Sequence, residues 1–274
     1  MKKKILIIGL KSFIGSNLFK YFISKKNKAT MTSFENFLKN FKSFDCRFDF
    51  IINCSSNKKF IKNIYNVKND HDLIIANKIK NSNTNLVTLS TRKIYKPKFN
   101  IKESDKKNPN CNYSKNKLKS EISIKKILNN RSLILRISNL IGSPINNSRK
   151  LHKTFLDFFF ETIKQGYIYE NKKIYKDFIS INKFNEIVYQ LIKKNSYGAF
   201  NVSIGKKVYL NKIITWLNFY NSNKTIVIRT KKSFNKDSFT LNNRKLMNKI
   251  KIKNDLYNLK KKCLLISKNF FIHQ

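Results

Sequence analysis

The chain begins with an apolar strand that runs directly into a glycine-containing turn and a helix. Residues 4–8, KILII, form a continuous apolar run, which is typical of a parallel strand buried on both faces of a sheet. Gly9 and Gly15 bracket the turn, and apolar residues then recur at helical spacing over 16–23. The chain has only six glycines, so two of them here indicate a tight bend or a close approach of the backbone. This start predicts a parallel α/β sheet.

Strands and helices continue to alternate through the first half of the chain. Buried strands are expected at 49–54, 85–91 and 132–138, and helices at 66–80 and 112–128. This alternation predicts a doubly wound parallel sheet, the Rossmann fold, with right-handed crossovers. After Gly142 the pattern is less regular, with a helix expected at 151–166 and a strand near 200–205. We therefore predict an α/β protein with a domain boundary near residue 142.

The turn between residues 9 and 15 has the features of a pyrophosphate-binding site. Backbone amides at a helix N-terminus point toward a ligand, and the helix dipole adds partial positive charge. Ser12 stands where a third glycine is usual; its side chain can donate a hydrogen bond but can also crowd the pyrophosphate. The alternative is an ordinary strand–helix turn. We expect a dinucleotide to bind through Gly9, Lys11, Ser12, Phe13, Ile14 and Gly15.

Small and polar side chains close the second buried strand. Asn53, Cys54 and Ser55 stand at its carboxyl end, the edge where ligands bind in a parallel sheet. They either let a cofactor lie across the sheet or serve only as loop residues. We include them in the predicted cofactor site.

A tyrosine and a lysine four residues apart form the predicted catalytic centre. Tyr113 and Lys117 share one face of the helix expected at 112–128. A phenol with its usual pKa of about 10 is a poor proton acceptor at neutral pH, but a neighbouring ammonium lowers that pKa. Such pairs also arise by chance in a lysine-rich chain. Thr91, at the end of the strand at 85–91, favours a catalytic role, in which Tyr113 exchanges a proton while a hydride moves to or from a nicotinamide ring.

The net charge of +43 raises the question of a nucleic-acid partner. It comes from 58 Lys and Arg against 15 Asp and Glu. The lysines are spread along the whole length and accompany many Asn, Ile, Phe and Tyr, which favours compositional drift over a built polyanion site. We expect no specific nucleic acid, but a preference for anionic substrates and salt-sensitive binding.

Cysteine, histidine and hydropathy patterns point to a cytoplasmic protein without a metal. The four cysteines and three histidines lack metal-ligand spacing, so no metal site is predicted. Unpatterned cysteines suit a reducing compartment. Lys11 ends the first apolar run too early for a signal peptide. No stretch approaches the roughly 18 apolar residues of a membrane span, so no membrane segment is expected.

Taken together, these motifs resemble the extended short-chain dehydrogenase/reductase family, in its branch of NAD(P)-dependent nucleotide-sugar epimerases, dehydratases and reductases. GLKSFIGSNL is similar to the family's G-x-x-G-F-I-G-S-x-L, STRKIY to S-[ST]-x-x-V-Y, and YSKNKLKSE to Y-x-x-S-K-x-x-x-E. LRISNLIG, KDFISINKF and FNVSIG resemble three later family segments. The series runs in order from residue 4 to residue 205.

The resemblance implies a catalytic trio of Thr91, Tyr113 and Lys117, with Lys117 also holding the nicotinamide ribose. It implies a nucleotide-linked sugar as substrate, for surface polysaccharide biosynthesis. Residues 1–142 would form the NAD(P)-binding Rossmann domain, to which 177–205 return, and 143–274 mainly a small C-terminal substrate-binding lobe. Family dehydratases carry Asp-Glu directly after the catalytic Thr. Arg92 and Lys93 stand there and cannot replace them, which leaves a 4-ketoreductase or a 4-epimerase.

The choice between NAD and NADP stays open in the sequence. Glu35, twenty residues after the turn, would bind a ribose 2′-hydroxyl. Lys25, Lys26 and Lys28 would instead accept a 2′-phosphate.

A different class of function also fits. Ser12 and the short stretch between the turn and the second buried strand are compatible with a non-catalytic NAD(P)-binding or sensor protein that keeps the fold. A homodimer is kept as a hypothesis for the assembly.

Overall fold

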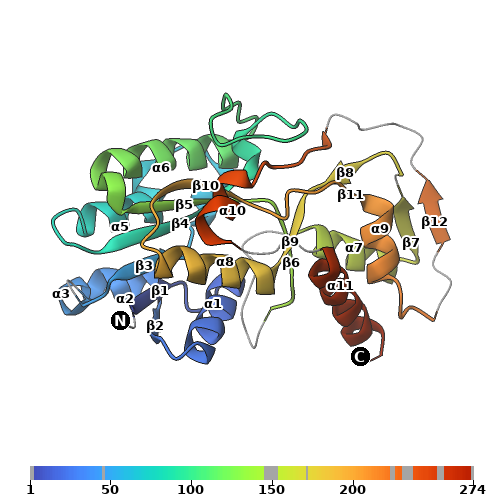
Figure 1. Cartoon of the computed structure of the whole chain (residues 1–274), viewed down its shortest axis with the longest axis horizontal. Coiled ribbons are helices and arrows are strands. Elements are labelled where there is room, and N and C mark those ends of the chain that lie inside the picture. Colours follow the sequence, from blue (N-terminus) through green and yellow to red (C-terminus); the bar gives the residue numbers. More distant parts are fainter. Residues whose placement is uncertain are drawn as a thin grey trace.

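A six-stranded parallel sheet forms the centre of the molecule (Figure 1). The computed structural model of the chain describes residues 3–44, 47–144, 154–170, 172–222, 226–229, 237–251 and 256–272. The strand order is β10-β5-β4-β3-β1-β2. The strands are β1 (Lys4–Ile8), β2 (Lys28–Thr32), β3 (Phe50–Asn53), β4 (Asn85–Thr91), β5 (Ser132–Ile137) and β10 (Gly198–Val202).

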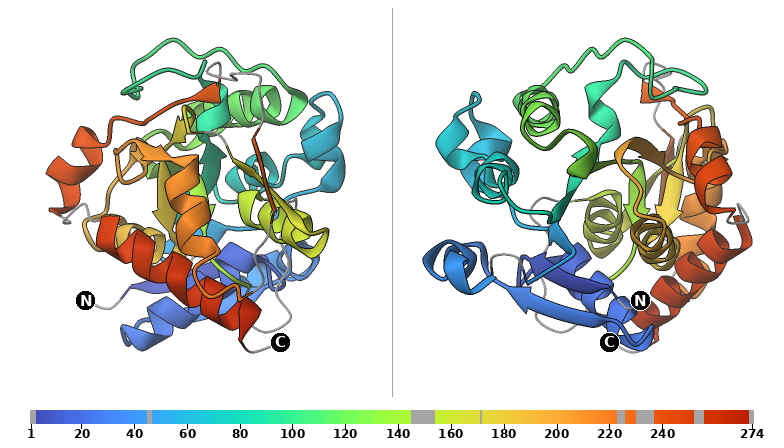
Figure 2. Two further views of the ribbon diagram at one scale, coloured as in Figure 1. Left: turned by 90° about the vertical axis from the view of Figure 1, so that its right-hand side faces the viewer. Right: turned by 60° about the vertical axis from the view of Figure 1, so that its left-hand side comes forward.

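Helices cover both faces of this sheet, which is why its inner strands are apolar throughout (Figure 2). In β1, Ile5 and Ile7 join the apolar cluster that includes α1 (Phe13–Ser24) and α8 (Ile181–Lys193). Leu6 and Ile8 point the other way, into a cluster with α2 (Phe34–Lys39), α5 (His71–Lys78) and α6 (Asn112–Leu128). The doubly wound α/β fold is confirmed.

β2 and the helix expected at 66–80 differ from the sequence prediction. β2 was not predicted, because KATMT at the edge of the sheet is partly exposed and has no apolar run. The helix expected at 66–80 is split into a short 3-10 helix, η1 (Val67–Asn69), and α5. The split follows from Asp70, whose carboxylate accepts a hydrogen bond from the Leu73 amide (3.1 Å) and caps the N-terminus of α5.

The second half of the chain builds a smaller lobe, at the right of Figure 1, and also contributes to the sheet. Its short strands pair as β6 (Asn139–Ile141) with β9 (Phe178–Ser180), β7 (Tyr167–Glu170) with β12 (Ile226–Arg229), and β8 (Tyr175–Lys176) with β11 (Val208–Tyr209). The helix expected at 151–166 is α7 (Phe155–Lys164), with residues 151–153 outside the described part. The other helices are α3 (Phe41–Phe44), α4 (Lys58–Lys62), α9 (Leu210–Leu217), α10 (Arg244–Ile250), α11 (Leu256–Phe271) and the 3-10 helices η2 (Arg92–Ile94) and η3 (Asn129–Arg131).

One apolar core joins the lobe to the sheet. The cluster that contains Ile5 and Phe22 continues through Phe178 to Trp216 and Leu259. The lobe is therefore packed directly onto the α1 face of the sheet, beside the edge where the parallel strands end.

Candidate active site

The first turn is closely packed at both of its glycines. Gly9 has a φ of +129°, and a Cβ there would lie 2.9 Å from the carbonyl carbon of Cys54. A Cβ at Gly15 would lie 3.0 Å from the carbonyl oxygen of Gly9. The start of α1 is therefore pressed against the residue that follows β3. This close backbone cradle is what a dinucleotide diphosphate requires at a helix N-terminus.

Ser12 replaces the usual third glycine without backbone strain. Its φ of −77° suits any residue, and its hydroxyl caps α1 by accepting a hydrogen bond from the Gly15 amide (3.3 Å). The Ser12 amide donates to the carbonyl oxygen of Gly9 (2.8 Å). The side chain thus stabilises the start of the helix while still lining the cavity next to it.

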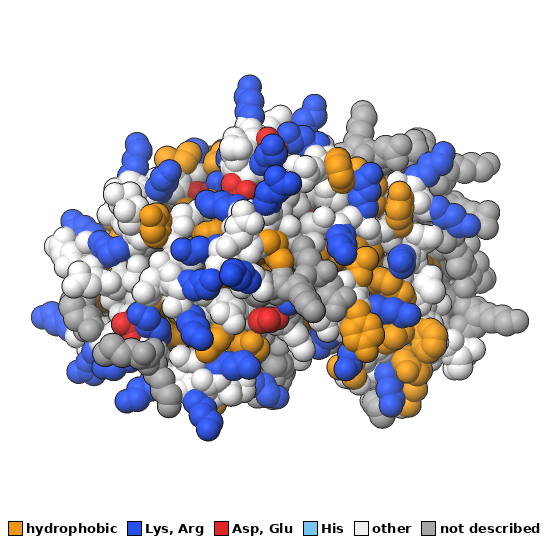
Figure 3. All heavy atoms as spheres, in the orientation of Figure 1, with side chains coloured by type: hydrophobic (Ala, Val, Ile, Leu, Met, Phe, Trp, Pro, Cys, Tyr) orange, Lys and Arg blue, Asp and Glu red, His pale blue; other side chains and the backbone are white. Residues whose placement is uncertain are grey.

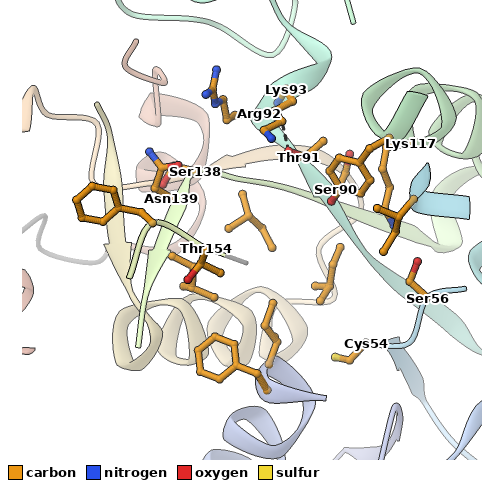
Figure 4. A pocket seen from close by; sticks show the side chains of 18 of the residues that line it. Cys54, Ser56, Ser90, Thr91, Arg92, Lys93, Lys117, Ser138, Asn139 and Thr154 are labelled. Carbon is orange, nitrogen blue, oxygen red and sulfur yellow. Dashed lines mark hydrogen bonds between the residues drawn. The ribbon is translucent and has the colours of Figure 1, made fainter. Parts of the chain in front are cut away.

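A cavity of about 470 Å³ opens at this edge, between the ends of β3 and β4 and the lobe (Figure 4). Thr91 and Lys117 lie on one side of it, with Cys54 and Ser56 below them, while Ser138, Asn139 and Thr154 face them from the other side. Nine of the predicted site residues line this one cavity: Ser12, Phe13, Ile14, Asn53, Cys54, Ser55, Thr91, Tyr113 and Lys117.

The other three predicted residues lie elsewhere. Gly9 and Gly15 are not among the lining residues and act by shaping the turn. Lys11 is exposed and also absent from the lining. The turn thus contributes Ser12, Phe13 and Ile14 to the lining of the cavity, whereas Lys11 is an exposed residue outside that lining.

Helix α6 and strand β4 bring the predicted catalytic trio together. Tyr113 stands in the first turn of α6 and Lys117 one turn later on the same face. Thr91 is the last residue of β4, and its hydroxyl also accepts a hydrogen bond from the Lys93 amide (3.2 Å). Burial raises the pKa of Tyr113, against the lowering effects of Lys117 and of a hydrogen bond with Thr91. The three residues therefore lie together at one cavity, around a phenol that burial keeps protonated at neutral pH.

Lys117 is held by a carboxylate that the sequence analysis did not identify. Its ammonium lies 2.9 Å from Oδ2 of Asp72, and both side chains are buried. Although burial opposes the charged form of Lys117, Asp72 raises the pKa of the ammonium overall. Asp72 stands 45 residues before Lys117, on α5, and no local motif marks it. Only the packing of α5 against α6 brings the two together.

Asn53 organises this network from the end of β3. Its amide donates to Oδ1 of Asp72 (2.7 Å), and its side-chain oxygen accepts hydrogen bonds from the amide (3.0 Å) and the hydroxyl (2.7 Å) of Ser55. Both the amide nitrogen and the side-chain oxygen of Asn53 therefore form hydrogen bonds within the protein. It fixes the turn after β3, where a cofactor role was predicted for it.

Two cations meet one exposed carboxylate on the lobe side of the cavity. The Arg92 guanidinium lies 3.1 Å from Oδ1 of Asp237 and 4.0 Å from the ring centroid of Phe239. Lys176 forms an ion pair with the other oxygen of Asp237. The Asp237 side chain is 48% exposed, whereas those of Arg92 and Lys176 are largely buried. An anionic ligand group could replace this carboxylate between the two cations.

The register of β2 bears on the choice between NAD and NADP. Lys28 pairs with Lys4 at the beginning of β1, while the glycine turn follows the end of β1. Lys25 and Lys26 come directly before this strand. The alternative in which these lysines accept a 2′-phosphate is wrong, because they lie at the amino ends of the parallel strands, whereas the glycine turn lies at the carboxyl ends. Glu35 is exposed in the first turn of α2, which follows the carboxyl end of β2, so it lies on the same side of the sheet as the glycine turn.

Metal-ion sites and membrane-spanning helices can be assessed for the described residues. Among them, no group of three or more His, Cys, Asp or Glu is placed to hold a metal ion; Cys46, His152 and His273 lie outside this part of the chain. In the same residues, every helix is too short or too polar to cross a bilayer.

Comparisons with known proteins agree with this architecture. The model of the family described as RmlD substrate binding domain matches residues 3–165. A comparison with curated protein sequences finds no match. The following solved structures resemble the chain over nearly its whole length at low sequence identity.

UDP-N-acetylglucosamine 4-epimerase from Methanobrevibacter ruminantium, solved with UDP-N-acetylmuramic acid, has a TM-score of 0.80 at 19% identity, covering 98% of this chain and 99% of that chain. WbmG from Bordetella bronchiseptica, solved with NAD, has a TM-score of 0.78 at 15% identity, covering 99% and 95%. A dTDP-4-dehydrorhamnose reductase from Clostridium acetobutylicum has a TM-score of 0.73 at 16% identity, covering 97% and 99%. At these identities the likeness shows the fold.

Proposed function

The chain belongs to the RmlD substrate binding domain family, within the extended short-chain dehydrogenases/reductases, and we propose that it is an NAD(P)-dependent oxidoreductase or epimerase acting on a nucleotide-linked sugar. The observation that carries the proposal is that Thr91, Tyr113 and Lys117 line the same cavity as the start of α1. Similar folds in a nucleotide-sugar epimerase and a nucleotide-sugar reductase support it. We place the enzyme in the cytoplasm and its product in surface polysaccharide.

NAD or NADP is the proposed cofactor. At Gly9 and Gly15 the first turn packs closely on itself and on the backbone after β3, which brings the start of α1 to the cavity, where a dinucleotide diphosphate would bind. The start of α1 would hold the diphosphate, Cys54 and Ser55 would border the cofactor, and Lys117 would hold the nicotinamide ribose. When bound, the nicotinamide supplies or accepts the hydride.

The chain's own groups would control the proton and the sugar. Tyr113 holds the proton that is exchanged with the reacting sugar oxygen. Thr91 contacts Tyr113 and would orient the same sugar oxygen from the end of β4. Lys117 sets the charge beside the phenol. Lobe residues close the opposite side of the cavity and would keep water away from the reacting atoms.

The lobe side of the cavity would bind the charged part of the substrate. Arg92 and Lys176 are placed for the diphosphate of a nucleotide sugar, which would take over the position of the Asp237 carboxylate. Arg92 and Lys93 leave no acid–base pair directly after Thr91, which favours a 4-ketoreductase or a 4-epimerase over a dehydratase. We accordingly propose that 1–142, with 177–205 returning to it, binds the cofactor, and that most of 143–274 binds the substrate.

The direct test uses the purified chain with oxidised or reduced NAD(P) and a panel of UDP- and dTDP-linked sugars. The panel contains 4-keto sugars, tested with NADH or NADPH, and 4-hydroxy sugars, tested with NAD or NADP. We expect a reductase to consume reduced cofactor with a 4-keto sugar, and an epimerase to interconvert two sugars with no net change in nicotinamide absorbance. Mass spectrometry identifies the products. Cofactor binding without turnover of any substrate would instead favour a non-catalytic sensor.

A further inference from the structure

We propose that Asp237 is a specificity-determining residue, whose carboxylate competes with anionic ligands for Arg92 and Lys176 and so excludes anions that have no further contacts in the cavity. The inference rests on the proposed function, because the diphosphate of a nucleotide-linked sugar is the anion expected to displace this carboxylate. It gives Asp237 a role in choosing the ligand, separate from the chemistry of the catalytic trio.

The charged residues that line the cavity are four cations and a single carboxylate. Asp237 is the one acidic residue among the described residues of the lining, beside Arg92, Lys93, Lys117 and Lys176. Its Oδ1 lies 3.1 Å from the Arg92 guanidinium, and its Oδ2 accepts a hydrogen bond from the Lys176 ammonium. The carboxylate therefore neutralises both cations that are proposed to bind the substrate diphosphate.

The carboxylate is held in this position by the segment that follows it. The Ser238 hydroxyl accepts a hydrogen bond from the Tyr175 amide (3.3 Å), and the Phe239 amide donates one to the Tyr175 carbonyl oxygen (3.3 Å). Phe239 is fully buried. Tyr175 directly precedes Lys176 on β8, so the backbone keeps Asp237 beside one of its two cations. A group that is tethered in this way acts at a high effective concentration.

The ion pairs of Asp237 are nevertheless open to displacement. Its side chain is 48% exposed, whereas those of Arg92 and Lys176 are 10% and 20% exposed. Burial alone would raise the pKa of Asp237, but hydrogen bonds with Lys176 and Arg92 and their charges lower it overall, so the carboxylate is charged at neutral pH. A half-exposed carboxylate can move into water, while the two largely buried cations still need an anionic partner.

Both cations have support that is independent of this carboxylate. The Arg92 guanidinium lies 4.0 Å from the ring centroid of Phe239. Lys176 is a strand residue of β8 and pairs with Val208 of β11. Removing the charge of Asp237 should therefore leave both cations at the cavity and free for a ligand. If Asp237 instead served to position them, its removal would weaken the binding of anions.

Competition by a tethered group lowers the affinity of every anion by the same factor, because each must bind the fraction of molecules in which the cations are free. Ion pairs at a partly exposed site are weak, so for two of them this factor is roughly 2 to 30. A small anion held by charge alone is thereby excluded, whereas a nucleotide sugar keeps its contacts with the rest of the cavity. In a chain of net charge +43, which attracts anions in general, this exclusion keeps the site available for the substrate.

The test is isothermal titration calorimetry of the cofactor-free chain with UDP, and separately with inorganic pyrophosphate, at one fixed ionic strength. We expect Asp237→Asn to bind both probes roughly 2- to 30-fold more tightly than the wild type. Glu186→Gln is the matched control, because Glu186 is a 39% exposed carboxylate that lies 2.9 Å from the Lys183 ammonium on α8, outside the lining of the cavity. This control should bind UDP with the affinity of the wild type.

A second comparison shows whether the gain arises at these two cations. In a Lys176→Gln background, the carboxylate of Asp237 retains only Arg92 as a partner. Adding Asp237→Asn should then increase the affinity for UDP by less than in the wild-type background, and by about fivefold at most. Circular dichroism reports whether each variant folds. If Asp237→Asn does not fold, Asp237→Ala removes the same charge and carries the same comparisons.

Three results would overturn the proposal. They are an affinity for UDP that is equal or lower in Asp237→Asn than in the wild type, an equal gain in Glu186→Gln, and the absence of binding of both probes in every variant. Absence of NAD(P) binding and of turnover would reject the proposed function instead, because the titrations are carried out without cofactor and without reaction.

Discussion

At the scale of single residues, the proposed chemistry depends on a phenol under opposing influences. Burial and Asp72 raise the pKa of Tyr113, and Lys117 and Thr91 lower it. Tyr113, Lys117 and Thr91 were predicted from their spacing and from the family resemblance, because helical periodicity and the ends of parallel strands place them close together. Asp72 could not be predicted in this way, since its role exists only once α5 packs against α6.

Removing the phenol tests this account of the trio. Tyr113→Phe should lower turnover roughly 10²- to 10⁴-fold, the usual contribution of a positioned acid or base. The affinity for NAD(P)H, measured by fluorescence titration, should be nearly unchanged, because the glycine turn remains intact. Undiminished turnover in this variant would show that another group moves the proton.

A buried carboxylate away from the trio gives a prediction about pH and stability. Burial raises the pKa of Asp177 to about 7, above its usual value of 3.8, despite a hydrogen bond from the Leu241 amide (3.0 Å). The folded state therefore binds more protons than the unfolded state between these values. The contribution of Asp177 to the free energy of unfolding consequently decreases as pH rises from about 4 to about 7.

Asp177→Asn removes that dependence and keeps an acceptor for the Leu241 amide. Urea unfolding across this pH range should show the variant gaining stability relative to the wild type as pH rises, by about 4 kcal/mol at most. A difference that stays constant with pH would mean that Asp177 does not titrate in this range.

At the scale of elements, strongly patterned segments were predictable and polar ones were not. The helix expected at 112–128 and the strand expected at 85–91 have the bounds of α6 and β4. A long amphipathic run and a buried apolar run each have a clear hydrophobic period, which determines the type of secondary structure. β2 lies at the edge of the sheet, where pairing with β1 rather than apolar content makes the strand. The later start of α5 depends on the Asp70 cap.

The cap at the start of α1 can be tested by two substitutions at one position. Ser12→Ala removes the acceptor for the Gly15 amide and should lower the free energy of unfolding by about 1 kcal/mol. Ser12→Gly should cost only a few tenths of a kcal/mol, because glycine is tolerated at this cap position. Urea denaturation compares the two variants. Equal losses would indicate that the hydroxyl does not stabilise the helix.

At the scale of the whole molecule, charge is spread rather than gathered. Lys and Arg side chains occur over the entire face seen in Figure 3, with few Asp and Glu among them. Within the cavity, by contrast, Arg92 and Lys176 are each matched to Asp237. The +43 net charge therefore supplies a general attraction for anions, while Arg92 and Lys176 are the two cations proposed to bind the diphosphate of the substrate.

Binding to DNA should accordingly be weak at physiological salt. The affinity for duplex DNA, measured by fluorescence anisotropy, should fall about 10³- to 10⁵-fold between roughly 50 and 200 mM salt, and should not depend on sequence. Sequence-selective DNA binding that persists at the higher salt concentration would indicate a nucleic-acid partner instead.

The most direct test of the central claim is a crystal structure of the chain with bound NAD or NADP. We predict that the cofactor diphosphate lies on the turn between Gly9 and Gly15 and that its nicotinamide ring lies beside the Tyr113 hydroxyl, with Lys117 on the ribose. A nicotinamide ring remote from Tyr113, or a dinucleotide bound away from the first turn, would contradict the account.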